Sequence, residues 1–85
     1  MSEIKVDRKE ELREYVKGNT FKESNLIKDD TLIFQEGFFD SMGFVMLMDF
    51  IEQKFGVTTE DDDLIEENFE SINAISDFIQ RKLSN

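Results

Sequence analysis

Residues 40–56 read DSMGFVMLMDFIEQKFG, and this stretch decides the fold class. Asp40 and Ser41 are both residue types that cap the start of a helix, and Gly56 is the residue type that most often ends one. No Pro interrupts the run between them, and its apolar positions recur at three- and four-residue spacing. The pattern predicts a helix from Ser41 to about Phe55.

Apolar side chains cover more than one face of this helix. We expect a core-facing stripe made by Phe44 or Val45, Met48, Ile51 and Phe55, with Leu47 beside it. Met42, Met46 and Phe50 fall elsewhere around the helix. Such a helix is either wrapped by neighbours or presents an apolar contact surface.

An earlier helix is predicted over about residues 7–17. Asp7 is its expected N-cap with Glu10 as the capping-box partner, and Gly18 followed by Asn19 is its expected stop. Its apolar stripe comprises Leu12, Tyr15 and Val16.

Residues 18–40 read mostly as a loop, with a helical turn near 21–27. Apolar anchors are expected to pin this loop across the bundle: Phe21, Leu26, Ile27, Leu32, Ile33 and Phe34.

The C-terminal third predicts a short helical turn and a last helix. Residues 58–67 are acidic and turn-like, and a helical turn is expected to end near Phe69. Ser71 is then expected to cap a last helix that runs to about Leu83. The inward face of this helix is expected to consist of Ile72, Ile75, Phe78 or Ile79, and Leu83. Three main helices, a short fourth and no convincing strand predict an all-α, up-and-down four-helix bundle formed by a single domain, 1–85.

Composition excludes several classes of function. The chain has 85 residues, no Cys and no His, which removes thiolate nucleophiles, Ser-His triads and the usual zinc ligands. It also lacks a Gly-rich phosphate loop, so enzymatic activity of the chain alone is not expected. Its longest apolar run, 44–48, is too short for a membrane span, and no signal-peptide pattern opens the sequence. A cytoplasmic protein without membrane insertion is therefore expected.

Negative charge is concentrated in the second half of the chain. The net charge is −10, and residues 29–80 hold fourteen acidic side chains and one basic one, Lys54. Such a surface repels phosphate backbones, which argues against nucleic-acid binding, and it either steers basic protein partners or serves solubility. The acidic run 60–67 lacks the pattern of an EF-hand loop, so a solvated turn without a metal site is expected there.

Judged alone, Ser41 is an ordinary N-cap candidate, but with its flanks the sequence resembles acyl carrier proteins and peptidyl carrier domains. The family pattern is Asp-Ser-Leu or Asp-Ser-Met, followed by an apolar-rich helix that ends in Glu-x-x-Phe-Gly. Residues 40–42 and 52–56 match its two ends. The resemblance continues upstream through 34–39 and downstream through 67–72, so it covers nearly the whole chain.

The resemblance implies that Ser41 receives 4′-phosphopantetheine from coenzyme A, with Asp40 as its motif partner. A carrier of this kind holds an acyl or aminoacyl group as a thioester and is not itself an enzyme. The implied partners are a phosphopantetheinyl transferase, an acyl- or aminoacyl-loading ligase, and acyltransferase, synthase or condensation enzymes. The carrier itself is expected to be a monomer.

The resemblance also suggests residues for docking and for the carried group. Partner recognition is expected at Met42, Met46, Asp49 and Glu52. Phe44, Val45, Met48 and Phe78 are candidates either to line an acyl cavity or to fill it.

Departures from the pattern point to a specialised pathway. Fatty-acid carriers usually show more acids on the exposed face of the helix than this chain does, whereas the DSMG sequence at 40–43 looks like the motif of D-alanyl carrier proteins. A carrier in a specialised fatty-acid, polyketide or nonribosomal-peptide type of pathway is therefore expected.

Two other functions compete with the carrier. One is an unmodified acidic adaptor that binds a partner protein through the apolar face of helix 41–55. The other is a calcium- or magnesium-binding protein that uses residues 60–67.

Overall fold

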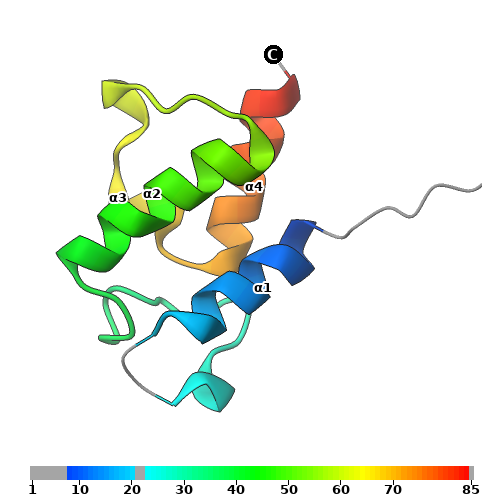
Figure 1. The fold of residues 1–85 in the computed structure, drawn as a ribbon. Coiled ribbons are helices and arrows are strands. Elements are labelled where there is room, and N and C mark those ends of the chain that lie inside the picture. The colour runs from blue at the N-terminus through cyan, green and yellow to red at the C-terminus, as the bar shows by residue number, and fades with distance from the viewer. Residues whose placement is uncertain (1–7, 21–22, 85) are drawn as a thin grey trace, which may run out of the picture.

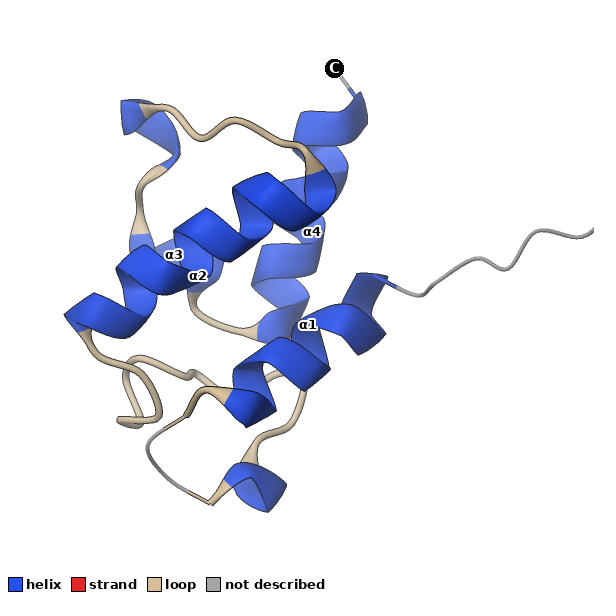
Figure 2. Ribbon diagram, viewed as in Figure 1, coloured by secondary structure: helices blue, strands red, loops and turns tan. Residues whose placement is uncertain are grey.

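The structure, a computed structural model, describes residues 8–20 and 23–84. Over these residues it forms four α-helices and no strand, and Figure 2 shows helices joined by loops. The helices are α1 (Arg8–Gly18), α2 (Ser41–Phe55), α3 (Glu66–Phe69) and α4 (Ile72–Ser84), which gather around one apolar core (Figure 1). The predicted all-α bundle of three main helices and a short fourth is confirmed. The predictions for Asp7 and Phe21 lie outside the described residues.

The α2 helix begins and ends where its sequence predicts. The carboxylate of Asp40 accepts a hydrogen bond of 2.9 Å from the backbone N–H of Gly43, which satisfies one of the free donors of the first turn. Gly56 adopts a left-handed backbone with φ of 73°, a conformation that glycine takes without a Cβ penalty. Asp40 alone is the N-cap, because Ser41 is already helical.

The core-facing side of α2 is centred on Leu47 and Ile51, both 0% exposed. Phe44, Met48, Phe50 and Phe55 are partly buried against the core. The alternative between Phe44 and Val45 is resolved in favour of Phe44, since Val45 is 60% exposed. Leu47 therefore occupies the middle of the stripe rather than its edge.

The α4 helix buries most of its predicted face. Ser71 caps it through a hydrogen bond of 3.1 Å from the N–H of Ala74 to the Ser71 hydroxyl. Ile72, Ile75, Phe78 and Ile79 are all buried. The prediction that Leu83 faces inward is wrong, because the last turn of α4 extends beyond the helices that cover its middle (Figure 1) and leaves Leu83 48% exposed.

The loop between α1 and α2 is anchored to the rest of the bundle at Asp29. The Asp29 carboxylate accepts hydrogen bonds of 2.8 and 2.9 Å from the Arg13 guanidinium, and its backbone carbonyl accepts one of 3.0 Å from the N–H of Asn73. Ile27 and Ile33 are buried anchors, as predicted. Leu26 is not an anchor: it lies in a 3-10 turn, Ser24–Leu26, that projects from the body of the molecule, and it is 57% exposed.

Candidate functional site

Ser41 is the first residue of α2, and its side chain is exposed. Because Asp40 supplies the cap, the Ser41 hydroxyl is not needed to satisfy the end of the helix. The N–H groups of Ser41 and Met42 lie in the first turn of α2 and have no helix carbonyl four residues before them to bind, so they and the helix dipole create a positive potential beside this hydroxyl. A phosphate ester on Ser41 would lie where negative charge is favoured.

The segment before Ser41 is held by a compact set of backbone hydrogen bonds. The carbonyl of Ile33 accepts from the N–H groups of Phe38 and Phe39, at 2.8 and 3.0 Å. The N–H of Ile33 donates to the carbonyl of Glu70 at 2.9 Å, which ties the segment to the end of α3. Gly37 makes the turn possible with φ of 86°. These bonds fix the direction in which the chain enters α2.

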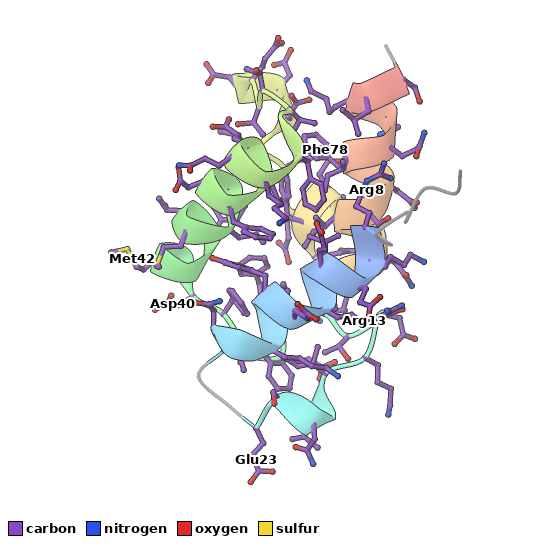
Figure 3. The ribbon with its side chains drawn as sticks, turned by 45° about the vertical axis from the view of Figure 1, so that its right-hand side comes forward. Arg8, Arg13, Glu23, Asp40, Met42 and Phe78 are labelled. Atoms are coloured by element: carbon purple, nitrogen blue, oxygen red, sulfur yellow. The ribbon has the colours of Figure 1, made fainter. Side chains whose placement is uncertain are left out.

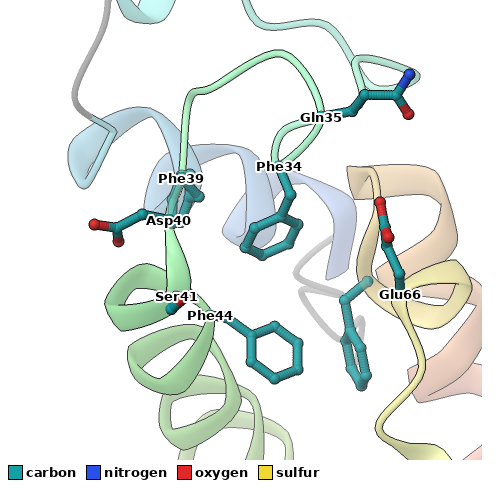
Figure 4. A pocket seen from close by; sticks show the side chains of 8 residues that line it. Phe34, Gln35, Phe39, Asp40, Ser41, Phe44 and Glu66 are labelled. Atoms are coloured by element: carbon teal, nitrogen blue, oxygen red, sulfur yellow. The ribbon is translucent and has the colours of Figure 1, made fainter.

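A hollow of about 710 Å³ lies beside Ser41, between the start of α2, the preceding loop and α3. We call it the Ser41 pocket, and its lining residues are Phe34, Gln35, Phe39, Asp40, Ser41, Phe44, Glu66 and Phe69. Figure 4 shows the rings of Phe34 and Phe44 pointing into it, while the Asp40 carboxylate points away. The attachment candidate therefore stands at the edge of a largely aromatic hollow.

Position 43 must be a glycine for Phe39 to form this wall of the pocket. A Cβ at position 43 would lie 2.7 Å from Cδ2 of Phe39, closer than side-chain carbons approach one another, and 3.3 Å from Cγ of the same ring. The ring of Phe39 can therefore cover the first turn of α2 only because residue 43 has no side chain. The sequence placed Gly43 in a motif but gave no sign of this contact.

The residues predicted to recognise partners do not all lie free on α2. Met42 and Met46 are 66% and 51% exposed, and the side chain of Met42 projects away from the body of the molecule (Figure 3). Asp49 is exposed and accepts hydrogen bonds from the amide of Gln53. The Glu52 carboxylate instead accepts from both the hydroxyl and the N–H of Thr59, and these bonds lower its pKa. Glu52 therefore also ties the loop after α2 to the helix.

The residues predicted to line an acyl cavity are dispersed. Only Phe44 lines the Ser41 pocket. Phe78 is 1% exposed on α4 and packs in the interior (Figure 3), and Met48 packs half-buried against the core. Val45 faces a different hollow on the other side of α2. The aromatic groups that do surround the pocket with Phe44 are Phe34, Phe39 and Phe69, which come from other elements.

A second hollow of about 700 Å³ lies between α1 and α2 and was not predicted. Its floor is the ring of Tyr15 stacked on that of Phe50, with centroids 4.1 Å apart and planes inclined by 15°. Burial and the nearby Asp49 carboxylate raise the pKa of Tyr15. The signal available in the sequence was the apolar Val45, Met46 and Phe50 on the outer faces of helix 41–55.

The acidic segment is organised by hydrogen bonds among its own residues and by Lys82. The Glu60 and Asp63 side chains form a reciprocal capping box around the 3-10 turn Asp61–Asp63. The Lys82 ammonium lies 2.7 Å from the Asp63 carboxylate and lowers the pKa of that group. Over residues 8–20 and 23–84, no three acidic side chains converge in a metal-binding arrangement. In the same part of the chain, no helix is both long and apolar enough to cross a bilayer.

Comparison with known proteins identifies the family of the chain. A family model described as a phosphopantetheine attachment site matches residues 10–79, which includes α2, α3 and nearly all of α1. No curated protein matches the sequence. Proteins of the matched family are carriers to which 4′-phosphopantetheine is covalently attached. The chain belongs to this family of phosphopantetheine carriers, the family of acyl and peptidyl carrier proteins.

Proposed function

We propose that Ser41 is the attachment residue for 4′-phosphopantetheine and that the protein carries an acyl or aminoacyl group between partner enzymes. One observation supports this most: the Ser41 hydroxyl is exposed at the first residue of α2, with the cap supplied by Asp40 instead. The hydroxyl is therefore accessible and can be esterified without loss of the helix cap.

The residues around Ser41 suit a phosphopantetheine ester. The start of α2 offers free N–H groups to a phosphate, and the carboxylate of the adjacent Asp40 is held by the N–H of Gly43. The Ser41 pocket provides an aromatic surface against which an apolar group can pack. When bound, the prosthetic group supplies the terminal thiol that this Cys-free chain lacks, and a thioester on that thiol is activated for transfer.

Partners are proposed to dock on the outer side of α2. Met42 and Met46 offer exposed, adaptable apolar side chains close to Ser41, and Asp49 adds a negative charge further along the helix. A net charge of −10 favours enzymes with basic docking surfaces. The proposed partners are a phosphopantetheinyl transferase, an acyl- or aminoacyl-loading ligase, and the acyltransferase, synthase or condensation enzymes that receive the group. The proposed carrier acts as a cytoplasmic monomer, within a specialised fatty-acid, polyketide or nonribosomal-peptide type of pathway.

The test is the intact mass of the purified protein before and after incubation with coenzyme A, magnesium and a broad-specificity phosphopantetheinyl transferase. The wild type should gain one phosphopantetheine, and Ser41→Ala should gain none. Ser84→Ala is the matched control, because Ser84 is also exposed but lies at the far end of α4, and it should be modified like the wild type.

Two outcomes would overturn the proposal. If Ser41→Ala still gains the group, the attachment residue is another one. If no variant is modified by a transferase that modifies a known carrier, nor by the transferase of the same organism, the protein is an unmodified adaptor that uses the exposed face of α2.

A further inference from the structure

The Ser41 pocket has a closed aromatic floor. The rings of Phe34 and Phe44 have centroids 5.7 Å apart, and that of Phe44 lies 5.5 Å from Phe69. Behind them, Phe69 meets Phe78 of α4 in an edge arrangement at 4.9 Å. Phe69 and Phe78 are 0% and 1% exposed. Ring contacts therefore run without a break from the wall of the pocket to α4.

These rings occupy the path into the bundle. A chain that passed beyond the pocket would have to separate Phe69 from Phe78, and both rings are buried in the core. Protein interiors are packed as densely as organic crystals, so extra methylene groups there force side chains out of their preferred rotamers. The interior below Phe69 is therefore closed to an alkyl chain.

The mouth of the pocket is polar and open to water. Gln35 and Glu66 are exposed at its edge, opposite Ser41 (Figure 4). The part of an alkyl chain that extends beyond the aromatic rings would meet these polar groups or solvent. It would gain no burial from its additional length.

We propose that the Ser41 pocket shelters a short acyl or aminoacyl group, and that Phe69, backed by Phe78, sets the length of chain the protein can protect. This inference rests on the proposed attachment at Ser41 and adds the class of the carried group to it. Phe69 is then the residue that determines chain-length specificity.

The experiment loads the full chain from butanoyl-, octanoyl- and dodecanoyl-coenzyme A with a broad-specificity phosphopantetheinyl transferase. Intact mass verifies each product, and the melting temperature is then compared with that of the unloaded protein. In the wild type, the octanoyl and dodecanoyl forms should melt within about a degree of the butanoyl form, because added carbons stay outside the core. The ring resonances of Phe78 should be the same in all three forms.

Phe69→Ala should remove the limit on the length of acyl chain that the protein can protect. The unloaded variant should melt well below the wild type, since a fully buried ring is lost. Its dodecanoyl form should recover several degrees, because the chain fills the space that the ring leaves. If Phe69→Ala does not fold, Phe69→Leu, which makes a smaller opening, is tested in its place. Phe55→Ala is the matched control: its ring packs on Phe50, outside the pocket, so loading should not rescue it.

The outcomes separate the two proposals. If the wild type gains no mass, attachment at Ser41 fails and this inference fails with it. If the wild type is loaded and its melting temperature rises steadily with chain length while the Phe78 resonances shift, the carrier function stands and the length limit is overturned. If dodecanoyl loading raised the melting temperatures of Phe69→Ala and Phe55→Ala equally, the length limit would also be overturned.

Discussion

Gly43 lies against the ring of Phe39 at the start of α2, and this proximity distinguishes it from Gly18, the glycine at the end of α1. Replacing a helical Gly by Ala normally stabilises a helix by up to about 1 kcal/mol. At position 43 the new Cβ would lie 2.7 Å from the Phe39 ring, so the ring must move. At position 18, by contrast, nothing lies within 4 Å of the added carbon.

We predict that Gly43→Ala destabilises the protein by about 1–3 kcal/mol, the usual cost of overpacking. Gly18→Ala, the control at the end of α1, should be neutral or slightly stabilising. Urea unfolding of both variants measures the difference. Equal stabilisation by the two substitutions would contradict the contact between Gly43 and Phe39.

Elements with strong local signals could be predicted from the sequence. The bounds of α2 follow from Asp40 and Gly56, whose effects depend on the adjacent residues alone. The start of α4 follows in the same way from Ser71. Attachment at Ser41 was inferred from a resemblance, and it stays a prediction, because the geometry of its surroundings does not itself identify a modified residue.

What escaped prediction depends on contacts between elements distant in sequence. The stacking of Tyr15 on Phe50 and the enclosure of Phe69 require knowing which helix faces which. Helical periodicity likewise placed Leu83 on the inward face, but periodicity does not tell where the neighbouring helices end.

The ion pair between Arg13 of α1 and Asp29 of the following loop predicts that the stability of the folded protein depends on pH. Hydrogen bonds from Arg13 lower the pKa of Asp29 below its usual value of 3.8. A group whose folded pKa is lowered adds stability that is complete above the unfolded value and is lost as the pH falls through the folded value. The pair is partly exposed, so its contribution at neutral pH is below about 1 kcal/mol.

Asp29→Asn should therefore melt below the wild type at pH 7, and this difference should shrink as the pH falls below 3.8. The control is Asp30→Asn, at the exposed neighbouring position. Its melting temperature should follow that of the wild type both at pH 7 and below pH 3.8. Thermal unfolding monitored by circular dichroism measures all three proteins. A difference that stays constant down to pH 2 would show that the charge of Asp29 does not stabilise the loop.

Over the whole molecule, negative charge opposes the compact state. Fourteen acidic side chains and one basic one lie in residues 29–80, and many of these acids are exposed. Salt shortens the distance over which like charges repel, to about 10 Å at 0.1 M and about 3 Å at 1 M. Screening should therefore stabilise the folded protein more than the expanded, unfolded chain.

We predict that the melting temperature rises by several degrees between low salt and about 0.5 M sodium chloride. The double variant Asp61→Asn and Asp62→Asn removes two exposed charges, so it should melt higher at low salt and respond less to added salt. Differential scanning calorimetry measures both effects. An unchanged melting temperature across the salt range would show that repulsion between the acidic side chains does not destabilise the folded protein.

Locating the modification shows whether the exposed serine at the start of α2 carries the prosthetic group. Cleavage by trypsin after Lys28 and Lys54 releases the fragment 29–54, in which Ser41 is the sole serine. After modification with coenzyme A and a phosphopantetheinyl transferase, fragmentation mass spectrometry should find phosphopantetheine on Ser41 of this peptide. The same group on a serine of another peptide would overturn attachment at Ser41.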